Sequence, residues 1–494
     1  MNENKTIRTF SLLLLSGVGF IIHFISAPFL ARSLTLEDNG IYNQTILVVD
    51  IAFMLFSLGI SNVTYLYLKR KDFSRYDVFW GNLMLAFSVG VLGAFLIFFV
   101  SPLVADYFSA PDLENYLKIY CLVVFFRLPL GVTEAAVILF GRIRAFTQRS
   151  LILAVFKTGS LILIIQLTQN LTLVFSAFVL LNLIQLLYSL FLVPKVFYQN
   201  ISWKKKTMVK MLGEGFIIAL NSIFGKATLL MDKTIVSSML MPQQFAIYRN
   251  GAIEIPFFSG IYRTISTTVL PELSRLFSEG KIHEIVRLKQ KAIANTAFII
   301  YPVLIFLLFF NDRFIFLYLS ERYMGSVPVF TIFNLTLLIR INSYGDIILV
   351  AGKYKTLIKI TAIGFLLGVA LNIIFIKAFG YIGAAIATLI TIAAINYFYL
   401  VLTSRILKIP IFAFFDFTYL FKILLLCSLL AFGLSKIPAD RESVVMFLAT
   451  VLFYAVICYY IILRYFMKDK SVILIISEKV PFFGKTLKKI IERW

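Results

Sequence analysis

The sequence predicts an all-α polytopic membrane protein with about fourteen transmembrane helices, within a range of twelve to fourteen. Three observations lead to this fold class. Of the 494 residues, 60% are hydrophobic, and the mean hydropathy of +0.91 excludes ordinary globular packing. Apolar windows of about 20 residues, the length that crosses a bilayer core, recur along the chain. The short loops between these windows carry nearly all of the basic residues.

The first apolar run follows Lys5 and Arg8, as in a secretory signal peptide. It continues to Leu34 without a clear cleavage site, so we expect it to remain as the first span. The seventh and eighth spans are interrupted by charged residues. The complete predicted set is Thr9–Leu34, Tyr42–Leu68, Val78–Val104, Tyr116–Phe140, Leu151–Leu167, Leu171–Val193, Leu212–Met239, Ala246–Leu273, Ala292–Leu317, Val327–Val350, Leu357–Ile376, Ile382–Ile406, Tyr419–Leu434 and Ser443–Met467.

The distribution of charge predicts the orientation of the chain. Lys and Arg number 47 against 25 Asp and Glu, which gives a formal net charge of +22. Alternate loops hold the basic residues, whereas intervening loops such as 35–41 and 105–115 hold almost none. The positive-inside rule therefore places the basic loops and both termini in the cytoplasm, for a protein of the bacterial inner membrane. The basic excess then serves topology and contact with anionic membrane lipid, and nucleic-acid binding is not expected.

An internal repeat divides the predicted spans. Leu34–Tyr42 (LTLEDNGIY) matches Leu240–Tyr248 (LMPQQFAIY) at an offset of 206, and Gly141–Arg144 (GRIR) matches Gly352–Lys355 (GKYK) at an offset of 211. Each pair lies at an equivalent helix junction, which indicates a duplicated six-helix unit whose copies run in the same direction. The expected domains are an N-terminal six-helix lobe (1–200), a C-terminal six-helix lobe (201–406), two extra transmembrane helices (407–468) and a cytoplasmic amphipathic tail (469–494). A cleft between the two lobes would allow alternating access.

Charged residues inside the spans are candidates for function, because a charge at the bilayer centre costs about 2.5–3.5 kcal/mol on insertion scales. Arginine suits a phosphate, since its planar fork donates two hydrogen bonds and stays charged when desolvated. A buried carboxylate can exchange a proton or bind a cation. Some of these residues can instead snorkel to water at a helix end. The candidate substrate-binding residues are Arg32, Arg127, Lys226, Arg249, Arg263 and Arg340, and the candidate cation-coupling residues are Asp50, Glu134 and Glu254.

The spacing of two candidates gives a local expectation. Arg127 and Glu134 are seven residues apart, so we expect them on one face of a helix, with Pro129 opening the backbone between them. No cluster of residues has metal-binding spacing, and the three cysteines, Cys121, Cys427 and Cys458, lie in apolar runs.

Several short motifs follow one another in a characteristic order. They are Ala31–Leu34, Glu37–Tyr42, Met231–Lys233, Ala246–Tyr248, Val269–Ser274 and Gly380–Ala385. In this order the whole chain resembles the polysaccharide exporter family of Wzx-type flippases, within the multidrug, oligosaccharidyl-lipid and polysaccharide exporter superfamily. Arg32 matches a basic site that recurs in this family after the first helix.

The resemblance implies two six-helix lobes plus two extra helices. It implies a flippase that moves an undecaprenyl-diphosphate-linked oligosaccharide from the cytoplasmic to the outer leaflet, for O-antigen, capsule or exopolysaccharide synthesis. Coupling to H+ or Na+, and partners such as a polysaccharide polymerase and glycosyltransferases, are also implied.

Two other transport functions stay open on the sequence. They are a lipid II flippase of peptidoglycan synthesis and a cation-coupled multidrug exporter, whose pocket should be more acidic or more apolar. An integral-membrane glycosyltransferase or ligase would need a sizeable external loop, whereas the longest predicted external loops have about a dozen residues. Because no catalytic constellation stands out, we expect a carrier and not an enzyme.

Overall fold

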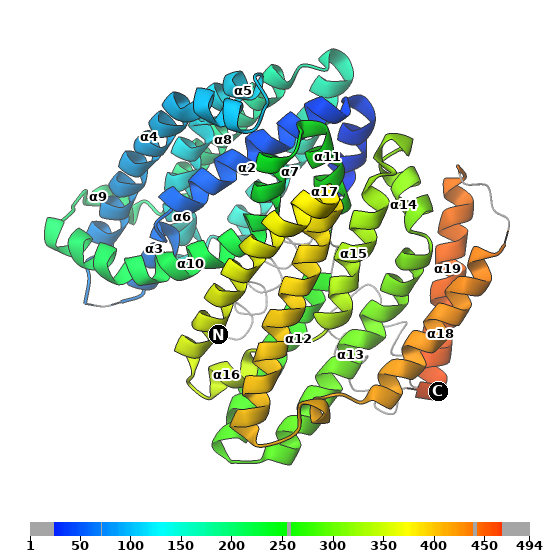
Figure 1. Ribbon diagram of the computed structural model, residues 1–494. Helices are drawn as coiled ribbons and strands as arrows, with labels where there is room; N and C mark the ends of the chain where they lie inside the picture. Colours follow the sequence, from blue (N-terminus) through cyan, green and yellow to red (C-terminus); the bar gives the residue numbers. More distant parts are fainter. Residues whose placement is uncertain (1–23, 71, 254–257, 438–441, 467–494) are drawn as a thin grey trace. The chain divides into compact units, whose positions relative to one another are not determined.

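The computed structural model describes residues 24–70, 72–253, 258–437 and 442–466, and every regular element among them is a helix (Figure 1). The predicted all-α fold is confirmed. Nine helices of this described part are long and apolar enough to cross a membrane. One of them, α17 (Tyr354–Leu407), contains two of the predicted spans and is kinked between them at Gly380, where φ is 60°. The chain is thus a multi-pass membrane protein, and the number fourteen stays a prediction. The start of the first predicted span and the predicted tail lie outside the described residues.

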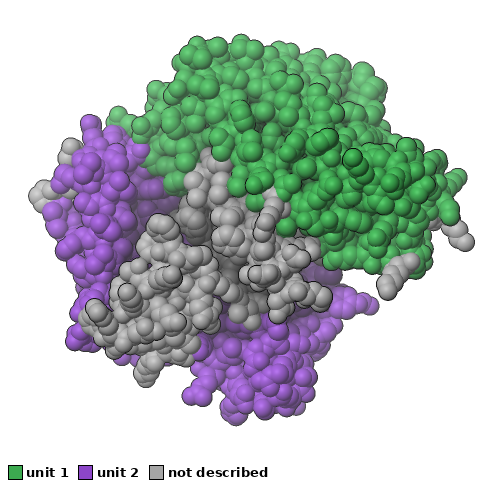
Figure 2. Space-filling model, turned by 180° about the vertical axis from the view of Figure 1, so that it is seen from behind, with its two compact units in different colours: residues 1–256, 318–329, 365–388 green, residues 257–317, 330–364, 389–494 purple. Residues whose placement is uncertain are grey.

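The first compact unit comprises residues 1–256, 318–329 and 365–388 (Figure 2). Residues 24–33 are the described part of its first helix. Its core packs α2, α4, α6 and α8 around fully buried aromatic rings such as Phe79 and Phe175. The helices that begin and end in this unit are α2 (Leu36–Phe56), α3 (Ile60–Tyr67), α4 (Arg75–Tyr107), α5 (Leu113–Tyr120), α6 (Leu122–Leu139), α7 (Ile143–Thr168), α8 (Leu171–Leu192), α9 (Val196–Gln199), α10 (Lys205–Met239), α11 (Pro242–Gly251) and η1 (Glu321–Tyr323).

The second compact unit comprises residues 257–317, 330–364 and 389–494. Within it α13 packs against α12, α18 and α19. Three helices, α14, α15 and α17, contribute residues to both units. The helices of the second unit are α12 (Phe258–Ser278), α13 (Ile282–Phe309), α14 (Asn311–Tyr318), α15 (Ser326–Ile339), α16 (Asp346–Val350), η2 (Ile411–Phe414), α18 (Phe417–Ser435), α19 (Val444–Ile461) and η3 (Ile462–Phe466).

Apolar side chains cover the outside of these helices as well as their packed faces. On α4, Val91, Leu92, Phe95, Phe99 and Leu103 are all exposed. Such a surface would be unfavourable in water, whereas lipid tails are as apolar as these side chains. The helix surface therefore fits a membrane environment.

The start of α2 corrects one expectation. Residues 35–41, predicted as an external loop, form the first turns of a helix that begins at Leu36. Thr35 caps this helix, because its hydroxyl oxygen accepts a hydrogen bond from the Asp38 backbone N–H at 3.0 Å. Glu37 and Asp38 in the first turn suit the positive end of the helix dipole. The polarity that suggested a loop is instead the signature of a helix N-terminus.

Several spans predicted as continuous helices are interrupted in the structure, among them the second, the eighth and the tenth. The second span is broken at Leu58 and Gly59, whose φ angles are 41° and 66°. The eighth is divided between α11 and α12, and the tenth between α15 and α16, where residues 340–345 are not helical. A hydropathy window measures side-chain polarity and does not detect such backbone breaks.

The two glycine junctions that match in sequence have the same backbone geometry. Gly141 and Gly352 have φ angles of 84° and 71°. After them, the Arg142 N–H donates to the Val137 carbonyl at 3.1 Å, and the Lys353 N–H donates to the Ile348 carbonyl at 3.0 Å. These are the six-residue bonds of a Schellman helix end, which needs a left-handed residue.

Helix α11 packs along α2 (Figure 1). The side-chain amide of Gln243 donates to Glu37 Oε2 at 2.9 Å, and Asn250 Nδ2 donates to Asn39 Oδ1 at 3.2 Å. The backbones nearly touch, since a Cβ on Gly40 would lie 2.0 Å from the Pro242 carbonyl oxygen. This joint therefore depends on a residue without a side chain.

Candidate functional site

An ion pair links α2 and α6 in the first unit. Arg127 Nη1 lies 2.9 Å from Asp50 Oδ1, and the Arg127 guanidinium also stacks 4.3 Å from the centre of the Phe53 ring. About two-fifths of each charged side chain stays exposed, 42% for Arg127 and 39% for Asp50. The pair is thus accessible to a ligand, although both residues come from apolar helices.

A second ion pair lies deeper, between α6 and α7. Arg149 Nη2 is 2.6 Å from Glu134 Oε1, and only 1% of the Arg149 side chain is exposed. Two of its guanidinium nitrogens, Nε and Nη1, have no hydrogen-bond partner among the described residues. Arg127 and Glu134 both lie on the one helix α6, which continues through Pro129, and each forms its ion pair with a residue of another helix. Arg149 follows Arg142 and Arg144 in a basic stretch of the sequence that is typical of a cytoplasmic loop, but it is a buried residue of α7.

The third pair lies on α10 and contacts α11. Asp232 Oδ1 is 3.3 Å from Lys233 Nζ, and its Oδ2 accepts a hydrogen bond from the Tyr248 hydroxyl at 2.7 Å. Both Asp232 and Tyr248 are buried. Arg249, one of the predicted substrate-binding residues, directly follows Tyr248. The hydrogen bond between Tyr248 and Asp232 therefore fixes the part of α11 that carries Arg249.

Two further cations, Arg249 and Lys157, belong with these three ion pairs but take part in none of them. The carboxylates of Asp232 and Asp50 attract Arg249, whereas Lys157 is attracted by Asp50 and repelled by the like charge of Arg127. Lys157 Nζ also lies 4.6 Å from the centre of the Phe178 ring. Neither cation forms an ion pair with a residue that the structure describes.

We call the eight residues the charge cluster: Asp50, Arg127, Glu134, Arg149, Lys157, Asp232, Lys233 and Arg249. Its five cations and three anions leave a formal charge of +2. Three cations are matched by the three carboxylates, and Arg249 and Lys157 supply the excess. Such a group favours an anionic ligand with about two charges.

The other predicted residues are placed as follows. Arg32 is exposed near the end of the first helix, and Arg340 is half-buried in the break between α15 and α16 of the second unit. Lys226 and Arg263 occupy α10 and α12, but their side chains lie outside the described part, as does Glu254 altogether. The structure thus brings together Asp50, Arg127, Glu134 and Arg249 in one unit.

Four members of the charge cluster, Arg149, Lys157, Asp232 and Lys233, are not among the predicted site residues, and two of them are the cations Lys157 and Arg149. Lys157 lies in an apolar predicted span, and a charge at such a position indicates a candidate for function. Snorkelling of its side chain to water explains this charge equally well. Arg149 gave no signal, since it follows Arg142 and Arg144 at the start of the same apolar run. Only the packing of α7 against α6 shows that it is buried.

Comparison with known proteins gives one family and a set of solved structures. The sequence model of the family described as "Polysaccharide biosynthesis protein" matches residues 29–328. No curated protein sequence matches the chain.

The chain is similar in fold to several solved structures, and three transporters serve as examples. "Lipid II flippase MurJ, inward closed conformation" is similar over 92% of this chain and 97% of its own, with a TM-score of 0.70 and 16% identity. An inward-facing multidrug resistance MATE family transporter of the MOP superfamily is similar over 81% and 98%, with a TM-score of 0.60 and 13% identity. A mutant form of the Vibrio cholerae MATE transporter VcmN is similar over 82% and 97%, with a TM-score of 0.53 and 14% identity. At these identities the likeness shows a shared fold.

Proposed function

Because this chain belongs to the polysaccharide biosynthesis protein family, we propose that it is a flippase for an undecaprenyl-diphosphate-linked oligosaccharide. In this proposal it moves the repeat unit from the cytoplasmic to the outer leaflet of the bacterial inner membrane. The product serves O-antigen, capsule or exopolysaccharide synthesis. Both termini are cytoplasmic, and the lobes 1–200 and 201–406 rock against one another.

The observation that supports this substrate is the excess of two cations in the charge cluster. A diphosphate linked to a lipid and a sugar carries about two negative charges near neutral pH. Arg249 and Lys157 are available to it, because the three carboxylates already have their own cations. The guanidinium of Arg249 can hold two phosphate oxygens at once, while Lys157 acts as a point charge.

The Asp50–Arg127 pair supports a coupling step. A phosphate that draws Arg127 away leaves the Asp50 carboxylate without its cation, close to a bound anion. That arrangement costs electrostatic energy unless Asp50 gains a new positive partner, which H+ or Na+ can supply. Glu134 fits this role less well, since its partner Arg149 is buried beside it. Asp50 is therefore our first candidate for coupling, with Glu254 as a further one.

The joint between α2 and α11 supports alternating access. It connects the first predicted lobe to the second through Glu37–Gln243, Asn39–Asn250 and the Gly40–Pro242 contact. The predicted topology puts this joint on the external side. Its opening and closing would control release of the substrate to the outer leaflet.

The two alternative substrates differ in charge. Lipid II also carries a diphosphate, so the charge cluster suits it equally, and only a direct comparison of sugars separates the two flippase functions. A cationic drug would be repelled by a cluster of charge +2. The multidrug function is accordingly the less favoured of the two.

The test is a flipping assay with the purified full-length protein in liposomes, using a fluorescent undecaprenyl-diphosphate oligosaccharide, fluorescent lipid II and a cationic dye as separate substrates. We expect transport of the first, and a loss of about tenfold or more for Arg249→Gln and Lys157→Gln. Arg275→Gln is the matched control, since Arg275 is half-exposed and lies in separate ion pairs with Glu272 and Glu279. Normal transport by both cluster variants would refute the site, and transport of lipid II or the dye alone would refute the substrate.

A further inference from the structure

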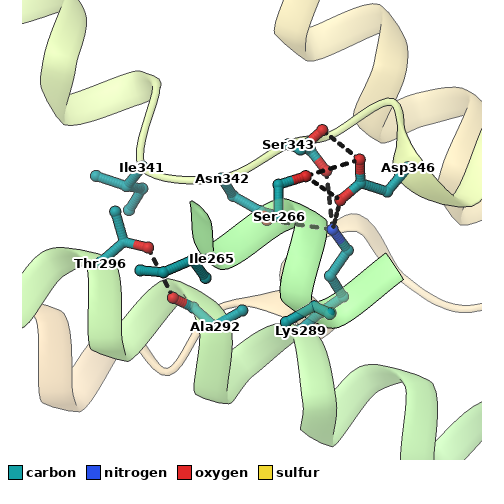
Figure 3. A pocket seen from close by; sticks show the side chains of 10 residues that line it. Ile265, Ser266, Lys289, Ala292, Thr296, Ile341, Asn342, Ser343 and Asp346 are labelled. Atoms are coloured by element: carbon teal, nitrogen blue, oxygen red, sulfur yellow. Dashed lines mark hydrogen bonds and ion pairs between the residues drawn. The ribbon is translucent and has the colours of Figure 1, made fainter. Parts of the chain in front are cut away.

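A second charged group lies in the second unit and shares no residue with the charge cluster. Lys289 on α13 points at Asp346, the first residue of α16, with Nζ 2.8 Å from Asp346 Oδ2 (Figure 3). The two side chains are 3% and 9% exposed. A buried pair of this kind is costly to desolvate, so its surroundings determine whether it is stable.

The surroundings form a cage of oxygen atoms around the lysine. Besides Asp346, Lys289 Nζ donates to the Ser343 carbonyl at 2.8 Å and to Asn342 Oδ1 at 3.2 Å. Its three N–H groups thus meet three acceptors. The carboxylate is held from its other side by the hydroxyls of Ser266 and Ser343, as Figure 3 shows.

The break between α15 and α16 provides the backbone carbonyl group of this cage. Residues 340–345 are not helical, so the Ser343 carbonyl is free to accept a bond from a side chain. Unwound backbone carbonyls at helix breaks are the groups with which transporters coordinate small cations. Carboxylate, amide and carbonyl oxygens are ligands that hard cations prefer.

The charge of the cage selects the class of ion. Among the described residues that line the adjoining pocket, Asp346 is the one acid and Lys289 the one base. A monovalent ion in place of the ammonium keeps the site neutral, whereas a divalent ion would leave one buried positive charge in excess. The pocket has room for about one water-sized species beside the lysine.

We propose that the oxygen cage of Asn342, Ser343 and Asp346 is a monovalent-cation site, in which the Lys289 ammonium and an alkali cation are alternative occupants. The lysine fills the site as a tethered cation. An alkali ion enters when the lysine side chain withdraws. This inference does not depend on the substrate proposed above, because it concerns ion binding to other residues.

The experiment compares purified full-length variants in detergent by thermal unfolding, at equal ionic strength in NaCl, KCl or choline chloride. Lys289→Met removes the tethered cation and leaves the cage. Lys289→Met with Asp346→Asn removes both charges. Lys233→Met is the matched control, because Asp232 also loses a buried lysine but keeps the attraction of Arg249 and the Tyr248 hydrogen bond, and lies within the continuous helix α10, whose carbonyls are engaged in helix bonds.

We expect the unfolding midpoint of Lys289→Met to be about 5 °C or more higher in NaCl or KCl than in choline chloride, with a saturable dependence on the ion. The wild type should need an ion concentration at least about tenfold higher for the same shift, since the ammonium competes. The double variant and Lys233→Met should respond equally to all three salts.

A response of Lys289→Met that is the same in all three salts would overturn the proposal, as would an identical response of Lys233→Met. If Lys289→Met does not survive purification in choline chloride, the yield of monodisperse protein becomes the measurement. Recovery in NaCl or KCl then supports the site, and equal loss in every salt contradicts it.

Discussion

Glu37 accepts a hydrogen bond from Gln243 at 2.9 Å, and the two residues occupy the same position in the matching segments Leu34–Tyr42 and Leu240–Tyr248. A two-fold rotation that relates two segments exchanges equivalent residues. Such residues can touch one another only close to the axis of that rotation. The contact therefore marks where an axis between the proposed repeats would pass, and it makes the α2–α11 joint the natural place to test movement.

Cross-linking this joint should stop transport. In Glu37→Cys with Gln243→Cys, a cleavable bifunctional thiol reagent should join the two helices, and flipping should fall to the level of protein-free liposomes until the reagent is cleaved. The three native cysteines are buried, so their background labelling should be small. Glu37→Cys alone, treated in the same way, is the control. Unchanged flipping by fully cross-linked protein would exclude opening of this joint from the cycle.

A side chain at position 40 should force α2 and α11 apart. Gly40→Ala places a Cβ where the Pro242 backbone lies, and overpacking of this kind costs about 1–3 kcal/mol. We expect a lower unfolding midpoint and weaker cross-linking between positions 37 and 243. Gly159→Ala in α7 is the control, because no atom lies within 4 Å of its added Cβ. Equal behaviour of the two alanine variants would contradict the close approach.

Loss of Glu134 should destabilise the first unit. Glu134→Gln leaves the Arg149 guanidinium buried without a counter-charge, which typically lowers the free energy of unfolding by about 3–5 kcal/mol. Replacing both residues, by Glu134→Leu with Arg149→Met, should restore most of that loss, since no buried charge then remains. Denaturant titration in detergent measures both effects. A double variant that is less stable than Glu134→Gln would show that the pair itself, and not the orphaned charge, determines stability.

The Asp50→Asn variant should keep nearly the full stability of the protein but lose the coupling of transport to a cation gradient. The Asp50–Arg127 pair is two-fifths exposed, so its loss should change the free energy of unfolding by no more than about 1 kcal/mol. Transport, however, should lose its dependence on a pH or Na+ gradient, because an amide cannot take up either cation. Glu114→Gln, which breaks the helical pair with Lys118 on α5, is the control and should keep that dependence. A gradient dependence that survives in Asp50→Asn would move the coupling role to another carboxylate, with Glu254 the next candidate.

The sequence alone determined the features that depend on composition and local pattern. Apolar runs such as Leu171–Val193 correspond closely to a helix, here α8, because burial of backbone polar groups in lipid leaves a helix as the available structure. Gly141 and Gly352 marked equivalent junctions, since a left-handed residue at a helix end strongly favours glycine. The all-α membrane fold followed from these local rules.

The tertiary structure decided which charges meet. Arg127 and Glu134 share a helix, and yet their partners are Asp50 and Arg149, 77 and 15 residues away along the chain. The helix breaks around Gly59 and before Asp346 were likewise not readable from hydropathy. An ion pair is set by the distance between two helices in space, and hydropathy and spacing along one chain contain no such distance. Sequence could therefore name Asp50, Arg127 and Glu134, while only packing showed which charged residue each of them meets.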